Sequence, residues 1–183
     1  MSLLDDILVK LDAMPADRLE ALKERYVADR PVWLPNVGAQ ADAYYSKADV
    51  LLYGGAGGGG KSDLGLGLAF TAHRRSLILR RRYANLSALT ERAIQINGSR
   101  NGFNGSPPPL LRANVGGIER YIQFGANQHL GDEQDWQGHP FDLKYVDEAT
   151  QHLEAQIRFH LGWLRSVEEG QRTRMVLGTN PPI

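Results

Sequence analysis

The sequence predicts an α/β fold in which a mainly parallel β-sheet carries helices on both faces. Four apolar runs have the length of strands and lie at residues 49–54, 76–79, 141–147 and 174–179. Three helical patterns separate these runs and cover residues 61–73, 85–97 and 151–165. This alternation favours a parallel sheet, because parallel strands need a long crossover connection that is usually a helix.

The helical assignments rest on apolar residues that recur at helical spacing. Those of the second pattern are Leu86, Leu89, Ala93 and Ile96. Those of the third pattern are Leu153, Ile157, Leu161 and Leu164. An amphipathic helix packs such a stripe against its neighbours.

Two segments between these elements are rich in turn-forming residues. Residues 97–109 read NGSRNGFNGSPPP and predict a surface loop,. The stretch RANVGGIERYIQFG, at 112–125, resembles a β-hairpin placed between a helix and a strand,.

The N-terminal segment indicates a separate element. Residues 3–28 carry two successive apolar stripes and predict a helical hairpin,. Two prolines and a glycine in RPVWLPNVG predict a linker over 30–38,. We therefore divide the chain into a hairpin and linker, 1–34, and a main domain, 35–183.

Composition limits the class of protein. Of the 183 residues, 42% are apolar, which is enough for a core,. Lys plus Arg and Asp plus Glu both number 21, so the net charge does not indicate nucleic acid or an acidic membrane as a partner,. The absence of cysteine excludes disulfides and thiolate zinc sites,. The acidic start and the lack of an apolar run of about 20 residues predict a protein that is neither secreted nor membrane-spanning.

A glycine-rich stretch after the first predicted strand indicates a phosphate-binding loop. Its pattern G-x-x-x-x-G-K-[ST] is made by Gly55, Gly60, Lys61 and Ser62, with Ala56, Gly57, Gly58 and Gly59 inside it. Glycines allow backbone N–H groups to surround a phosphate, the lysine reaches its outer oxygens, and the serine hydroxyl binds Mg²⁺. The loop also opens a predicted helix, whose N-terminus favours an anion.

Two acids end the third predicted strand. Nucleotide hydrolysis needs one acid in the Mg²⁺ shell and a second that polarises the attacking water. We assign the first role to Asp147 and the second to Glu148. The alternative is a pair of solvated acids that cap the following helix, and Lys144 favours it by making the strand less uniformly apolar.

Other polar residues follow two of the predicted strands. Thr179 and Asn180 end the last strand, where they either sense the γ-phosphate or only mark the end of the strand. Arg80, Arg81 and Arg82 follow the second strand and either contact phosphate or DNA, or are solvated.

The sequence resembles the large subunit of phage terminases, the DNA-packaging motors, from about Pro35 to Pro182. The likeness runs through PNVGAQADAYYSKADVLLYGGAGGGGKS, AHRRSLILRR, IQFGANQH, KYVDEAT, FHLGWLRS and GTNPP. It implies a P-loop ATPase of the subclass with an extra catalytic glutamate, which uses ATP and Mg²⁺ to drive double-stranded DNA into a prohead. It further implies a homo-oligomeric ring in the host cytoplasm, with the portal and the small terminase subunit as partners and no membrane.

The resemblance also implies a role for individual residues. The four polar residues of the site keep the roles given above, namely Lys61, Ser62, Asp147 and Glu148. Thr179 and Asn180 match the motif that couples hydrolysis to movement. Gln40 matches a glutamine that contacts adenine, and this role rests on the resemblance alone.

Two departures from the family leave other interpretations open. Many members place an arginine in the phosphate loop, where this chain has Ala56 and glycines, so Arg80, Arg81, Arg82 or a neighbouring subunit must supply it. Family members also carry a C-terminal nuclease domain, whereas this sequence stops at Ile183, immediately after the coupling motif. We therefore expect no DNA cleavage from this chain. The alternatives are a truncated, catalytically silent module that binds nucleotide or docks a subunit, and a P-loop kinase of small metabolites.

Overall fold

The computed structural model describes residues 3–28 and 30–180 and divides the chain into two units, Met1–Pro31 and Val32–Ile183. The first unit holds two helices, α1 (Leu3–Asp12) and α2 (Ala16–Ala28), in the segment where the sequence predicts a helical hairpin. The two predicted apolar stripes include Leu4, Ile7 and Tyr26, whose side chains are not among those that the structure describes. No helix among the described residues is long and apolar enough to cross a membrane.

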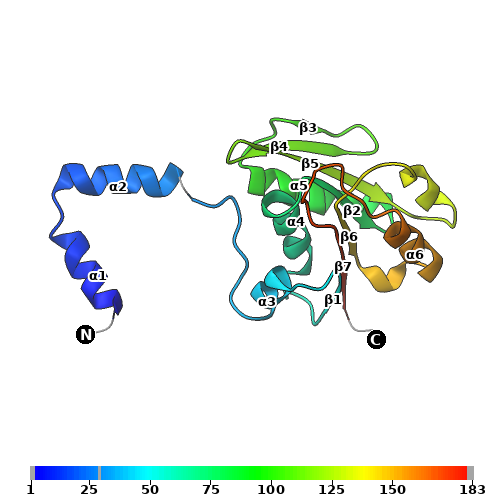
Figure 1. The fold of residues 1–183 in the computed structure, drawn as a ribbon, viewed down its shortest axis with the longest axis horizontal. Coiled ribbons are helices and arrows are strands. Elements are labelled where there is room, and N and C mark those ends of the chain that lie inside the picture. The colour runs from blue at the N-terminus through cyan, green and yellow to red at the C-terminus, as the bar shows by residue number, and fades with distance from the viewer. Residues whose placement is uncertain (1–2, 29, 181–183) are drawn as a thin grey trace. The chain divides into compact units, whose positions relative to one another are not determined.

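The second unit contains one seven-stranded sheet with the order β1-β7-β6-β2-β5-β4-β3 (Figure 1). Its first five strands are mutually parallel, and β4 and β3 continue it in antiparallel pairing. The strands are β1 (Val50–Gly54), β2 (Arg75–Arg80), β3 (Phe103–Asn104), β4 (Leu110–Val115), β5 (Ile118–Ala126), β6 (Leu143–Asp147) and β7 (Arg174–Thr179). The predicted α/β fold with a mainly parallel sheet is therefore confirmed.

The β4–β5 hairpin has a larger role than the sequence predicts. Gly116 and Gly117 form its turn with φ angles of 61° and 80°, which glycine adopts without steric cost,. Its second strand, however, pairs in parallel with β2 and extends the sheet. Strand β3 lies inside the segment that the sequence predicts to be a loop.

Helices α3 (Ala39–Tyr45), α4 (Lys61–Thr71) and α5 (Ser87–Asn97) contribute to the apolar core on one face of the sheet. The predicted stripe of α5 is buried, from Leu86 at its start to Ile96. Helix α4 approaches its neighbours very closely at its two internal glycines. A Cβ at Gly65 would lie 2.4 Å from the ring of Tyr145, and one at Gly67 would lie 2.3 Å from the ring of Trp33. These contacts explain why a helix contains two poor helix formers.

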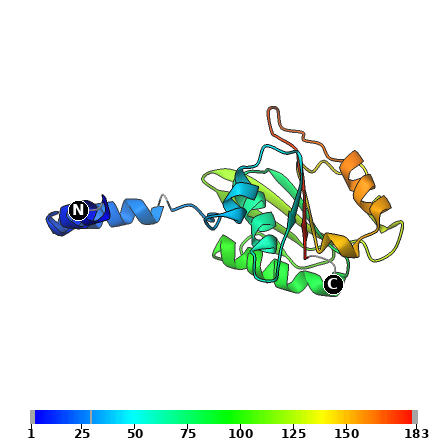
Figure 2. The same ribbon diagram turned by 90° about the horizontal axis from the view of Figure 1, so that it is seen from below.

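Helix α6 (Glu154–Gly162) covers the opposite face together with the 3₁₀ helices η2 (Asp132–Trp136) and η3 (Ala149–Gln151) (Figure 2). The predicted stripe of α6 is partly wrong. Leu153 and Leu161 are 44% and 42% exposed, whereas the buried side chains of this helix are Gln156 and His160. The helix is turned in this way because polar groups beneath it need hydrogen-bond partners.

Candidate functional site

The phosphate loop connects β1 to α4 and lines a cavity of about 370 Å³. Gly58 and Gly60 adopt φ angles of 82° and 67°, a region that favours glycine,. A Cβ added at Gly55, Gly57 or Gly58 would meet no protein atom within 4 Å. The loop is thus open on the side where its backbone can approach a ligand.

Side chains from the loop and from β1 hold the loop in shape. The ammonium group of Lys61 donates hydrogen bonds to the carbonyl oxygens of Gly55, at 3.0 Å, and Ala56, at 2.7 Å. The Tyr53 hydroxyl donates to the carbonyl oxygen of Gly59 at 3.0 Å. The ammonium group of Lys61 therefore already lies at the loop. Phosphate oxygens can replace the two carbonyl oxygens as its hydrogen-bond acceptors, because an ionised acceptor binds an ammonium group more strongly.

Gln40, at the start of α3, supports the end of the loop. Its Nε2 donates to the carbonyl oxygen of Gly60 at 2.7 Å, and its Oε1 accepts from the backbone N–H of Asn36 at 2.6 Å. A Cβ at Gly60 would lie 2.4 Å from Gln40 Nε2, so this close approach also requires glycine. The structure places Gln40 against the loop, and its contact with adenine stays a prediction.

Ser62 and Asp147 meet although 85 positions separate them in the sequence. The Ser62 hydroxyl lies 3.2 Å and 3.0 Å from the two carboxylate oxygens of Asp147. The buried Tyr145 hydroxyl donates to the carbonyl oxygen of Lys61 at 2.7 Å and lies 3.4 Å from Asp147 Oδ1. Burial raises the pKa of Tyr145, and the neighbouring Asp147 raises it further, so this tyrosine stays a neutral donor,. It ties the first turn of α4 to β6.

Arg80 forms an ion pair with the same carboxylate. Its Nε and Nη2 lie 2.8 Å and 2.6 Å from Asp147 Oδ2, and the Asp147 side chain is only 3% exposed. The guanidinium group thus neutralises a carboxylate that would otherwise be buried without a counter-charge. The sequence left contact with phosphate, contact with DNA and solvation open for Arg80, and this pair with Asp147 was not among them.

The two following arginines differ from Arg80 and from each other. Arg81 donates through Nη1 to the carbonyl oxygen of Asn127 at 2.5 Å and to Gln156 Oε1 at 2.9 Å, which places it under α6. Arg82 is exposed, and its guanidinium group makes no hydrogen bond or ion pair with any residue in 3–28 or 30–180. Both line a surface cavity of about 550 Å³.

Glu148 has the most unusual backbone in the described part of the chain. With φ 53° and ψ 50°, it is the one non-glycine residue there with a positive φ angle. Such a conformation costs about 1–2 kcal/mol for a residue that carries a Cβ. Its half-buried carboxylate accepts no hydrogen bond from the residues that the structure describes. The turn therefore places a free carboxylate directly after Asp147.

Thr179 is the last residue of β7 and Asn180 follows it. This strand lies between β1, which leads into the phosphate loop, and β6, which ends at Asp147. Thr179 pairs in register with Gly54, and its hydroxyl lies 2.9 Å from that of Thr150. The side-chain oxygen of Asn180 is buried and accepts no hydrogen bond within the described ranges. The two prolines after Asn180 lie outside the described residues.

This arrangement fits a nucleotide and its metal ion. Ser62 and Asp147 present hard oxygen atoms on one side, which is the ligand type that Mg²⁺ prefers. The glycine loop, Lys61 and the N-terminus of α4 present positive groups and backbone donors suited to phosphates. Among the described residues, no three His, Cys, Asp or Glu side chains come together as a metal site, so Asp147 is the carboxylate ligand here and Ser62 supplies a hydroxyl.

Comparisons with known proteins identify the fold. The sequence matches no protein-family model and no curated protein. A structure of the large terminase from the thermophilic bacteriophage D6E matches 78% of this chain and 38% of its own, with a TM-score of 0.57 and 13% identity. The chain shares the fold of this part of the large terminase.

Two further structures of the same phage protein extend this likeness. The complex with ATP-gamma-S has a TM-score of 0.56 and the complex with ADP has one of 0.53, both at 15% identity. They match 78% and 77% of this chain, which spans 37% of each. These structures share the mainly parallel α/β fold that the sequence predicts, and the nucleotide complexes are those of the phage D6E terminase.

Three residues of the site were missed from the sequence. Tyr145, Tyr53 and Thr150 contact site residues through their hydroxyl groups. Tyr145 lies two residues before Asp147, and alternation along a strand puts both on the same face. This two-residue spacing could have indicated from the sequence that Tyr145 lies beside Asp147 at the site.

Proposed function

We propose that this chain is the ATPase domain of a viral DNA-packaging motor, a terminase large subunit that hydrolyses ATP to move double-stranded DNA into a prohead. The observation that carries the proposal is the contact between Ser62 and Asp147, with the free carboxylate of Glu148 beside it. A nucleotide-binding loop, a metal-binding acid and a potential base are thereby brought to one edge of the sheet.

Each residue has a defined task in this proposal. The loop from Gly55 to Gly60 and the Lys61 ammonium group bind and orient the phosphates. Ser62 and Asp147 would hold Mg²⁺, which neutralises charge on the phosphate oxygens when it is bound. Glu148 accepts a proton from the attacking water as general base. The left-handed turn at Glu148 places this residue directly after Asp147, at the carboxyl end of β6.

Arg80 is our candidate for the charge-stabilising arginine. It occupies Asp147 Oδ2, an oxygen that a divalent cation would also use. A cation at Ser62 and Asp147 would therefore compete with the guanidinium group and leave it free to contact phosphate oxygens. Arg81 is less suitable because its guanidinium is bonded to Asn127 and Gln156, whereas the exposed Arg82 stays available for phosphate or DNA.

The proposal includes partners and place. We propose that Thr179 and Asn180 couple hydrolysis to movement, that Gln40 helps to position adenine, and that the chain acts in a homo-oligomeric ring. The portal, the small terminase subunit and double-stranded DNA are its proposed partners, in the host cytoplasm. The support for these assignments is the fold likeness and the position of Thr179 beside the phosphate loop.

The test is phosphate release from Mg-ATP, with and without duplex DNA, by the natural sequence and by Glu148→Gln. We expect turnover to fall by about two to four orders of magnitude while ATP binding is retained, because only the proton acceptor is removed. Glu91→Gln, which changes an exposed glutamate of α5, is the matched control and should leave turnover unchanged. Equal turnover in Glu148→Gln would remove this residue from the mechanism.

The same assay separates the alternatives. A folded chain that binds ATP but releases no phosphate would support the silent nucleotide-binding or docking module. Phosphate that appears on an added metabolite rather than in water would support a small-molecule kinase. The paired acids Asp147 and Glu148 favour hydrolysis, since a kinase does not need a residue that activates water.

A further inference from the structure

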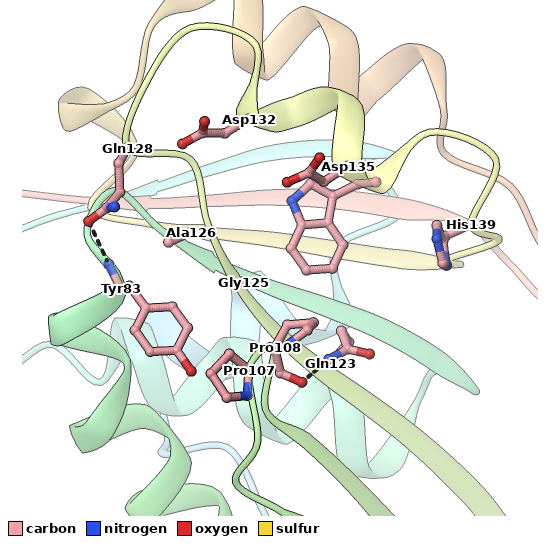
Figure 3. Close-up of a pocket in the computed structure, with 11 residues that line it drawn as sticks. Tyr83, Pro107, Pro108, Gln123, Gly125, Ala126, Gln128, Asp132, Asp135 and His139 are labelled. Carbon is pink, nitrogen blue, oxygen red and sulfur yellow. Dashed lines mark hydrogen bonds between the residues drawn. The ribbon is translucent and has the colours of Figure 1, made fainter.

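A second cavity, of about 600 Å³, lies at the carboxyl end of β5 (Figure 3), and its lining shares no residue with that of the phosphate loop. Its floor is Gly125 and Ala126 of β5. One wall carries Tyr83 and the Pro107-Pro108 pair, and the opposite wall carries Asp132 and Asp135 of η2. Its volume lies in the range of ligand sites, about 300–1,000 Å³.

The charge of this cavity is negative. No lysine or arginine belongs to its lining, whereas two carboxylates do. Asp132 uses one oxygen to accept the backbone N–H of His129 at 2.9 Å. Asp135 is exposed, and its carboxylate makes no hydrogen bond or ion pair within residues 3–28 and 30–180. The cavity therefore disfavours a nucleotide or a nucleic-acid backbone and favours a cation.

Flat apolar surfaces stand beside these carboxylates. Trp136 lies so close to the floor that a Cβ at Gly125 would be 2.2 Å from its Cζ2 atom. The indole is 8% exposed, and its N–H has no acceptor among the described residues. Tyr83 is 37% exposed and its backbone N–H is held by Gln128 Oε1 at 3.4 Å (Figure 3). Aromatic faces attract the guanidinium and ammonium groups of proteins.

We propose that this cavity is a docking site for a basic side chain, an arginine or a lysine, presented by a segment of a partner protein. Two carboxylates would pair with the cationic head, and the Tyr83 and proline wall would pack against the aliphatic stem. The cavity is larger than one side chain, so neighbouring residues of the segment also fit. This site is separate from the proposed ATP site and does not depend on it.

The test uses two peptides that differ only in charge, acetyl-Gly-Arg-Gly-amide and its citrulline analogue. Binding is followed by NMR on the indole N–H of Trp136, with Trp33 and Trp163 as internal references and Trp136→Phe for assignment. We expect the arginine peptide to shift the Trp136 signal with a dissociation constant of about 1 mM or below, and the uncharged peptide not to do so. Added salt should weaken the binding, because the carboxylates are exposed to solvent.

Variants then connect the binding to the carboxylates. Asp135→Asn should weaken the arginine peptide by about fivefold or more, since one of the two charges is lost. Asp42→Asn, at an exposed acid of α3 outside the cavity, should leave it unchanged. The proposal is overturned by an unmoved Trp136 signal at about 10 mM peptide. Equal shifts from both peptides, or an unchanged affinity in Asp135→Asn, would overturn it as well.

Discussion

The two faces of the sheet are built from different chemistry. On the face of α4 and α5, buried leucines, isoleucines and aromatic residues form a continuous apolar core. On the face of α6, a smaller apolar cluster is joined by a buried polar network. Lys144, on β6, is fully buried there and donates to the carbonyl oxygen of His160 at 2.9 Å. Burial lowers the pKa of Lys144 to about 8.

One side chain connects most of this polar network. Gln156 is fully buried and accepts hydrogen bonds from Arg81 and from the backbone N–H of Leu153, at 2.9 Å and 3.2 Å. It donates to the carbonyl oxygen of His129 at 2.7 Å and to Glu133 at 3.3 Å. On the apolar face, the helices are held by burial of apolar surface. On the polar face, the orientation of α6 is fixed by directional hydrogen bonds. This difference implies that the two faces respond differently to substitution and to pH.

The largest expected effect is on the apolar face. Phe70→Ala removes a fully buried ring of α4 and should lower the free energy of unfolding by about 3–5 kcal/mol,. Leu161→Ala, on the exposed side of α6, is the comparison and should cost less than about 1 kcal/mol,. Urea unfolding followed by circular dichroism measures both. Equal losses would contradict the assignment of the outer surface of α6.

Gln156→Ala tests the polar face. It removes four hydrogen bonds, two to the side chains of Arg81 and Glu133 and two to the backbone of Leu153 and His129, so we expect a loss of about 2–3 kcal/mol although little apolar area is removed,. The matched control is Gln95→Ala, at an exposed glutamine of α5, which should cost a few tenths of a kcal/mol at most,. A Gln156→Ala loss as small as that of the control would show that the network contributes little.

The polar face should also make stability depend on pH. Burial lowers the pKa of His152 to about 4, helped by nearby Arg81, and that of His160 to about 3, helped by nearby Lys144. In the unfolded chain both titrate near 6.5. The unfolded state therefore binds more protons below about pH 6.5, and stability is lost as the pH falls from there toward 4 and 3, by about 1.4 kcal/mol per pH unit and histidine.

Unfolding free energies at several pH values between 7 and 5 measure this slope. His160→Gln should reduce the slope of the unfolding free energy against pH by the contribution of one histidine. This holds however much the substitution changes the free energy of unfolding at pH 7. His139→Gln, at an exposed histidine, is the control and should keep the full slope. An unchanged slope in His160→Gln would show that this histidine is not held neutral.

The smallest expected effect is a gain in stability from a substitution at Glu148, the residue that follows β6. Glu148→Gly should raise the free energy of unfolding by about 1 kcal/mol, because glycine relieves the left-handed backbone,. Glu148→Gln keeps the Cβ and should not. Thermal unfolding of both variants separates the strain from the charge, and a glycine variant that is less stable than the glutamine variant would refute the strain.

The comparison also explains what the sequence could predict. The apolar face follows simple periodicity, and the burial expected for Leu89 and Ala93 of α5 is confirmed. The polar face breaks the pattern, since an apolar stripe suggests Leu153 and Leu161 as core residues. Helix orientation there is set by hydrogen bonds to distant residues, which no local pattern records.

The same limit applies to the candidate site. The phosphate loop, Asp147 and Glu148 were found because their residue types follow predicted strands. The pair between Arg80 and Asp147 joins residues 67 positions apart, and only the register of β2 beside β6 brings them together. The positive φ angle of Glu148 was also unforeseen, because glutamate seldom adopts it.

The salt bridge between Arg80 and Asp147 has a consequence for handling the protein. The arginine is an internal counter-ion, so the buried carboxylate of Asp147 is balanced without any dissolved salt or metal. Folding of this domain should therefore not depend on divalent cations, in contrast to domains whose metal provides their folding energy. A chelator should abolish the proposed ATP hydrolysis and leave the melting temperature unchanged, so the protein can be prepared in metal-free buffer and given Mg²⁺ later.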